Sequence, residues 1–281
     1  MSRYRAWAEL LRLPALFTVP GDALAGAAAA AVRPNRRTVL AVGCSLCLYE
    51  AGMALNDWAD RAEDAVERPH RPLPSGRVRP GAAFAAACAL TAAGLALAGR
   101  AGRPALAVAV PLAATVWSYD LGLKRTPVGP GAMAAARGLD LLLGAAATAG
   151  RVRPALPSAG LLATHTLAVT AVSRQETRDG SPFAPLAALA GTALLARLLA
   201  DHTPLTTALA LAYATTTARP YLHATLNPSP PLTQRAVGAG IRATIPLQAA
   251  LAARTGATAT ALGTAALAAL AGRFTRRVSI T

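Results

Sequence analysis

Residues 56–77 read NDWADRAEDAVERPHRPLPSGR, an acidic stretch that runs directly into a proline-rich basic one. The segment holds five of the thirteen acidic residues of the chain. If one helix continues through its acidic half, Asn56, Asp60 and Asp64 lie on one face with Asp57 beside them. Like charges on one face repel each other, and a divalent cation would remove that repulsion, since Mg²⁺ binds carboxylate oxygens and completes its shell with water and substrate phosphates. The segment therefore predicts a metal site, and the alternative is a solvated, charged helix end.

The basic half of the segment predicts a rigid turn. Three prolines and a glycine between Arg68 and Arg77 exclude a regular helix, and the turn carries Arg68 and Arg71 back toward the acidic face. Guanidinium groups bind phosphate oxygens, and a cation held by carboxylates neutralises phosphate charge. Together the two halves indicate a site for a diphosphate.

The sequence on either side of this segment is typical of a membrane protein. The chain has 281 residues, of which 54% are hydrophobic and 15% charged, with a mean hydropathy of +0.39. Soluble domains carry about 25% charged residues, and a helix that spans a bilayer needs about 20 apolar residues. Ten apolar runs approach this requirement: 13–32, 38–55, 81–99, 104–121, 131–149, 157–173, 183–200, 204–221, 236–253 and 257–272. Because the last run is short, we expect nine or ten transmembrane helices.

The basic residues predict an orientation in the membrane and argue against nucleic acid as a partner. The net charge is +15, but arginines stand in short clusters between the apolar runs and not along one face. Seventeen basic residues fall in one set of alternate connections and eight in the other. The first set comprises the N-terminus, 56–80, 122–130, 174–182, 222–235 and the C-terminal tail. Cytoplasmic loops are enriched in basic residues. We therefore expect a multi-pass protein of the cytoplasmic (inner) membrane, embedded in the lipid bilayer, with this set of connections in the cytoplasm.

The combined pattern N-D-x-x-D-x-x-x-D followed by R-P-x-R-P-L-P-S-G-R, at a membrane boundary, resembles the UbiA superfamily of intramembrane prenyltransferases. The resemblance implies an all-α fold: a polytopic membrane helix bundle of nine or ten transmembrane helices around a central apolar cavity. It covers nearly the whole chain in the layout of its spans, so we expect a single domain over 1–281.

Two further segments support the resemblance. The stretch YDLGLKRTP, from Tyr119, is similar to the family's Tyr…Lys-Arg segment, in which the lysine meets the diphosphate. Lys124 is the only lysine of the chain, and an ammonium acts as a compact point charge; the alternative is a basic anchor at the membrane surface. The stretch RGLDLLLG, from Arg137, is similar to the family's Arg-Gly-Leu-Asn-x-x-x-Gly. Charge inside a membrane usually faces the bundle interior, although Arg137 and Asp140 could also neutralise each other.

The second acidic motif of the family is altered in this chain. Most members have D-x-x-x-D between the sixth and seventh spans, where this chain has SRQETRDG over 173–180. Gln175 stands where the first aspartate is expected, with Glu176 beside it and Asp179 four positions beyond Gln175. The second Mg²⁺ site would therefore be held differently, be absent, or belong to a protein whose activity has changed.

The resemblance implies Mg²⁺-dependent transfer of an isoprenyl group from an isoprenyl diphosphate to an unidentified lipophilic or small-molecule acceptor. Two alternatives are a terpene cyclase on the same scaffold and a non-catalytic membrane protein that binds a prenylated lipid. The resemblance to the family also implies a catalytic role for Asp57, Asp60, Asp64, Lys124, Glu176 and Asp179. It implies metal binding by Asn56, Asp60, Asp64, Glu176 and Asp179. It implies substrate binding by Asn56, Arg68, Arg71, Tyr119, Lys124, Arg137 and Gln175.

Overall fold

The computed structural model describes residues 3–175, 180–200 and 203–277, and over these residues it contains helices, turns and no strand. The α-helices are α1 (Arg3–Leu10), α2 (Pro20–Ala29), α3 (Arg36–Ala59), α4 (Arg61–Glu67), α5 (Pro80–Ala101), α6 (Arg103–Leu121), α7 (Gly129–Ala149), α8 (Leu156–Ser173), α9 (Phe183–Leu199), α10 (Pro204–Leu226), α11 (Pro230–Ala253) and α12 (Thr258–Arg277). Three short 3₁₀ helices are η1 (Leu13–Thr18), η2 (Leu123–Arg125) and η3 (Arg153–Ala155). The all-α architecture predicted from the sequence is confirmed.

Each of the ten predicted apolar runs coincides with helical structure. Among the described residues, six helices are long and apolar enough to cross a membrane: α3, α5, α6, α7, α8 with η3, and α11. The apolar parts of α2, α9 and α12 are shorter, and α10 is interrupted by threonines, Arg219 and His223. Length and composition therefore support six of the nine or ten expected spans.

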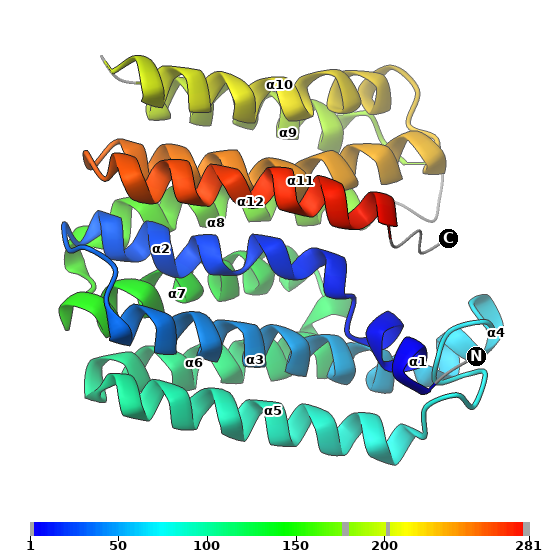
Figure 1. Ribbon diagram of the computed structural model, residues 1–281. Coiled ribbons are helices and arrows are strands. Elements are labelled where there is room, and N and C mark those ends of the chain that lie inside the picture. Colours follow the sequence, from blue (N-terminus) through cyan, green and yellow to red (C-terminus); the bar gives the residue numbers. More distant parts are fainter. Residues whose placement is uncertain (1–2, 176–179, 201–202, 278–281) are drawn as a thin grey trace.

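The long helices run side by side, so that α5 and the α9–α10 pair lie on opposite sides of the bundle (Figure 1). Along the chain α3 packs against α5 and α6, α7 packs against α6, α8 and α2, and α10 packs against α9 and α11. The apolar window of α11 is 78% buried and that of α5 only 22% buried. Because α5 turns most of its apolar surface outward, it is suited to face lipid, whereas α11 belongs to the interior.

Helices α2 and α7 touch through their backbones at two glycines. A Cβ atom on Gly144 of α7 would lie 2.4 Å from Cα and O of Ala23 in α2. A Cβ atom on Gly26 of α2 would lie 2.0 Å from the carbonyl oxygen of Leu141 in α7. Small residues allow this close approach between helices inside a membrane, and the contact fixes α7, which carries Arg137, against α2.

The acidic motif does not continue as one helix, so the condition under which Asn56, Asp60 and Asp64 would share one face is not met. Helix α3 ends at Ala59, Asp60 adopts φ −88° and ψ 3°, and α4 begins at Arg61, at the same end of the bundle as α1 (Figure 1). An aspartate offers its own side chain to the backbone and is a weak helix former, so a break at this residue is physically reasonable. The predicted turn is confirmed, since residues 68–79 form consecutive turns in which Gly76 has a φ of +72°.

Candidate active site

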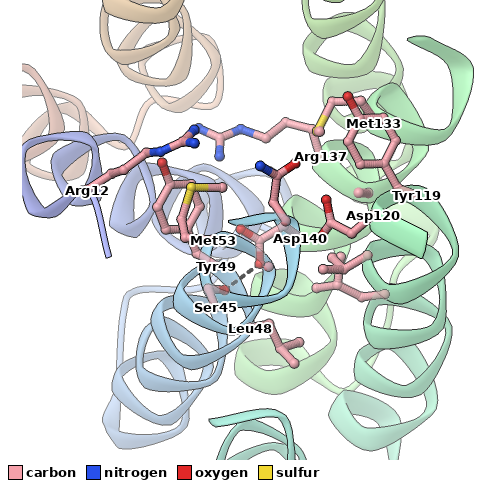
Figure 2. A pocket seen from close by; sticks show the side chains of 15 residues that line it. Arg12, Ser45, Leu48, Tyr49, Met53, Tyr119, Asp120, Met133, Arg137 and Asp140 are labelled. Atoms are coloured by element: carbon pink, nitrogen blue, oxygen red, sulfur yellow. Dashed lines mark hydrogen bonds between the residues drawn. The ribbon is translucent and has the colours of Figure 1, made fainter. Parts of the chain in front are cut away.

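A cavity of about 260 Å³ opens between α3, α6, α7 and the N-terminal segment (Figure 2). Its apolar wall includes Leu48, Leu112 and Val116. Its polar side chains are Arg12, Ser45, Tyr49, Asn56, Tyr119, Asp120, Arg137 and Asp140. Five of these, Asn56, Tyr119, Asp120, Arg137 and Asp140, lie in the segments that the sequence singled out. An apolar cavity with a few convergent polar groups is the usual form of a small-molecule site.

Asp57 and Asp64 face the arginines of the proline-rich turn. The Arg71 guanidinium donates to Asp64 Oδ2 at 2.7 Å and lies 3.7 Å from Asp57 Oδ1, so it bridges the two carboxylates. Arg68 lies 3.6 Å from Asp64 Oδ1. Arg12 donates to Asp57 Oδ1 at 3.0 Å from the N-terminal segment. The turn therefore does bring Arg68 and Arg71 to the acidic segment.

Asn56 and Asp60 face the other way, toward the connection after α6. Lys124 Nζ donates to Asn56 Oδ1 at 3.0 Å and to Asp60 Oδ2 at 2.7 Å, although more than 60 residues separate it from either partner. Arg125 donates to the second oxygen of Asp60 at 3.0 Å. The structure thus divides the four motif residues between two basic clusters, because the chain bends at Asp60. It does not present Asn56, Asp60 and Asp64 as one face.

Hydrogen bonds connect the proline-rich turn to α1 and also link residues within the turn. Arg77 donates to Glu9 Oε2 at 2.6 Å and to the carbonyl of His70 at 2.6 Å. Ser75 Oγ donates to the carbonyl of Arg71 at 2.6 Å. These contacts fix the backbone around Arg71. The turn therefore loses little conformational entropy when the Arg71 guanidinium binds the acidic residues.

The donor set at the mouth fits a hard divalent cation. Within the described residues, no three His, Cys, Asp or Glu side chains converge as a preformed metal site. Mg²⁺ does not require one, because it is usually held by one or two carboxylates together with substrate phosphates. Asn56, Asp57, Asp60 and Asp64 supply oxygen atoms, and the adjacent Arg71 and Lys124 could meet phosphate oxygens.

Arg137 lines the cavity and is held by α2 and not by Asp140. Its Nε lies 3.0 Å from Asp22 Oδ2, and its Nη2 donates to the Thr18 carbonyl at 3.1 Å. Gln248 donates to the same carbonyl at 2.8 Å and to Asp22 Oδ1 at 2.6 Å. Asp140 instead accepts a hydrogen bond from Ser45 (Figure 2). Arg137 and Asp140 therefore do not form the ion pair that was one of the two interpretations of their spacing.

The altered second motif is only partly visible. Glu176 and Asp179 lie outside the described residues. Gln175 follows α8, and its Oε1 accepts a hydrogen bond from the backbone N–H of Ser181 at 3.1 Å. It is not among the residues that line the cavity. In the described structure Gln175 therefore has a contact that holds the loop, while its expected part in substrate binding stays a prediction.

Two charged residues of the cavity, Arg12 and Asp120, were not predicted from the sequence as site residues. Arg12 follows α1 in a left-handed conformation, with a φ of +48°, and projects toward the cavity (Figure 2). Asp120 stands beside Tyr119 at the end of α6. Arg12 looks like one more basic residue of the N-terminus, so no local signal marks it. For Asp120 there is a signal, since a carboxylate within an apolar run is costly and usually functional.

Comparisons with known proteins agree with this architecture. Residues 15–229 match the model of the UbiA prenyltransferase family. A digeranylgeranylglyceryl phosphate synthase of Methanopyrus kandleri is 37% identical over 129 residues, which cover 44% of this chain and 46% of that protein. The synthase of the same name from Natronomonas pharaonis is 31% identical over 182 residues, which cover 64% of this chain and 66% of that protein. The match with the first relative thus spans about half of that relative's length.

Solved structures show the same fold at low sequence identity. A UbiA homolog from Aeropyrum pernix K1 superposes with a TM-score of 0.71 at 19% identity, covering 85% of this chain and 97% of that one. A UbiA homolog from Archaeoglobus fulgidus bound to GPP and Mg²⁺ superposes with a TM-score of 0.65 at 19% identity, covering 93% and 99%. With the family match over most of its length, the chain belongs to the UbiA prenyltransferase family.

Proposed function

We propose that this protein is a Mg²⁺-dependent prenyltransferase that moves an isoprenyl group from an isoprenyl diphosphate to an acceptor within the membrane. The observation that carries the proposal is the meeting of Asn56 and Asp60 with Lys124 at the mouth of a largely apolar cavity. Oxygen ligands for a cation, an ammonium for phosphate charge and space for a hydrocarbon tail are the three elements that such a substrate requires. The Archaeoglobus fulgidus homolog bound to GPP and Mg²⁺ supports the choice of ligands.

We assign metal binding, diphosphate binding and substrate contact to different groups of residues. Asn56, Asp60 and Asp64, with Glu176 and Asp179, would hold Mg²⁺, and Asp57 would support them. Arg68, Arg71 and Lys124 would bind the diphosphate, while Tyr119, Arg137 and Gln175 would contact the substrate. Bound Mg²⁺ would neutralise the diphosphate and so make it a better leaving group. The apolar cavity wall would exclude water from the allylic carbon when its bond to oxygen breaks.

The same proposal includes the place of the protein in the cell. Several apolar helices and the family make it a multi-pass membrane protein. We propose nine or ten spans in the cytoplasmic (inner) membrane, with the connections 56–80 and 122–130 on the cytoplasmic side. The distribution of basic residues supports this orientation, and water-soluble isoprenyl diphosphates would then reach the site from the cytoplasm.

A lipid that carries glycerol phosphate is the first acceptor to test. The relatives from Methanopyrus kandleri and Natronomonas pharaonis are named digeranylgeranylglyceryl phosphate synthases. In this chain Arg12 and Arg137 both line the cavity, and a guanidinium suits a phosphate group.

The test uses purified protein in lipid nanodiscs with dimethylallyl, geranyl, farnesyl and geranylgeranyl diphosphates. Each is incubated with and without Mg²⁺, and with and without a mono-prenylated glycerol phosphate. We expect diphosphate release and a prenylated product only when Mg²⁺ and an acceptor are both present. Release without acceptor, with a terpene as product, would instead identify a cyclase. A further set of reactions contains membrane extract as a source of other acceptors. No diphosphate release in any of these reactions would identify a binding protein.

A further inference from the structure

Asp120 is a buried carboxylate that is 5% exposed and that, within the described residues, makes no hydrogen bond and no ion pair. The positive charges of Lys124 and Arg12 act on it only from beyond contact distance. The acids of the motif differ, because Asp57, Asp60 and Asp64 each touch at least one arginine or lysine. An unpaired charge buried in a protein is costly, so a carboxylate in this state points to a ligand that is cationic or donates hydrogen bonds.

The carboxylate of Asp120 is directed into the cavity, toward α3 (Figure 2). Its Oδ2 would lie 3.6 Å from a Cβ atom on Gly52, a residue that itself lines the cavity. Gly52 precedes Asn56 by four residues, about 6 Å along α3. Lys124, which binds Asn56 and Asp60, follows Asp120 on the α6 side. Asp120 therefore lies in the cavity wall, next to the group formed by Asn56, Asp60 and Lys124.

We propose that Asp120 supplies a carboxylate oxygen to the divalent cation bound by the 56–64 segment, in place of the carboxylate that the chain lacks at Gln175. This inference rests on the proposed function, since it assigns a ligand to the same cation. Mg²⁺ accepts carboxylate oxygens from separate elements, provided that they converge. The orphaned Asp120 comes from α6, whereas the altered motif follows α8, so the cation would gain a ligand from a different side of the cavity.

The test measures metal binding directly. Mn²⁺ replaces Mg²⁺ as the probe and is titrated into the purified protein in nanodiscs with inorganic pyrophosphate present, while free Mn²⁺ is followed by electron paramagnetic resonance. We expect Asp120→Asn to weaken Mn²⁺ binding about tenfold or more. Loss of a group that only supports a metal ligand already lowers metal affinity by about this factor, and loss of a ligand should cost at least as much. Asp120→Glu, which keeps the carboxylate, should retain part of the affinity.

The matched control is Glu67→Gln, which removes one negative charge from an exposed position at the end of α4. We expect it to bind Mn²⁺ like the unchanged protein. If Asp120→Asn binds Mn²⁺ as tightly as the unchanged protein, the inference is wrong but the proposed function is unaffected. The same holds if the variant loses turnover while its Mn²⁺ affinity is unchanged. If the unchanged protein binds no Mn²⁺ with pyrophosphate, both the inference and the proposed metal dependence fail. Asp120→Asn removes an unpaired buried charge, so the variant should fold at least as well as the original, and its melting curve without metal checks this.

Discussion

At the scale of single residues, the sequence identifies the motif but not all of its contacts. Lys124 stands out because it is the only lysine, and the structure places its ammonium between Asn56 and Asp60. Arg12 could not be found in this way, since its contact with Asp57 spans 45 residues and depends on how the N-terminal segment folds back. Local patterns report chemistry, whereas such long-range pairs arise only from tertiary packing.

Replacing Lys124 tests whether its role is to bind a diphosphate. Its side chain is 11% exposed, and its ammonium makes two charge-assisted contacts. Such contacts are worth about 1.5–3 kcal/mol, so we expect Lys124→Ala to raise the KM for an isoprenyl diphosphate by roughly tenfold to a hundredfold. Lys124→Arg keeps the charge and should have a smaller effect. Steady-state kinetics in nanodiscs measure both, and equal effects would assign Lys124 to the membrane surface as an anchor.

At the scale of helices, hydrophobic runs predict the elements well and their junctions less well. All ten runs became helices, because apolar length alone favours a helix where the backbone cannot bond to water. The break at Asp60 was not predicted, since a spacing of four residues fits a continuous helix as well as a bent one. The cations on either side of the bend, Arg71 and Lys124, lie elsewhere in the sequence, so the spacing of the acidic residues alone does not show which residue meets which cation.

The contact between α2 and α7 gives a prediction at this scale. Gly144→Ala would place a methyl group 2.4 Å from the backbone of Ala23, which cannot rotate away. We expect the two helices to separate, with a loss of about 1–3 kcal/mol or more and a lower melting temperature in detergent. Gly131→Ala is the control on the same helix, because nothing lies within 4 Å of its Cβ position. A melting temperature of Gly144→Ala equal to that of the control would show that α2 and α7 do not pack this closely.

At the scale of the whole molecule, the distribution of basic residues predicts a fixed orientation in the membrane. Glu67 at the end of α4 and Thr255 in the connection from α11 to α12 are both exposed and belong to opposite sets of connections. In a variant whose three native cysteines are replaced, we expect Glu67→Cys to react with a membrane-impermeant maleimide only from the cytoplasmic side. Thr255→Cys should react only from the other side. Labelling of intact cells and of inverted vesicles distinguishes the two, and reaction of both residues from one side would refute the orientation.

The proposed chemistry depends on a cation that the acidic residues beside the cavity hold and that makes the diphosphate leave. It is tested by Mg²⁺-dependent diphosphate release from geranyl diphosphate, with acceptor present, by the unchanged protein and by Asp60→Asn. We expect release to require Mg²⁺ and to fall by roughly 100-fold in Asp60→Asn, the order of effect seen when one stabilising group is lost at a reacting centre. Glu67→Gln should retain full activity. Release that persists in EDTA, or an Asp60→Asn variant as fast as the unchanged protein, would show that no cation held by Asp60 drives the reaction.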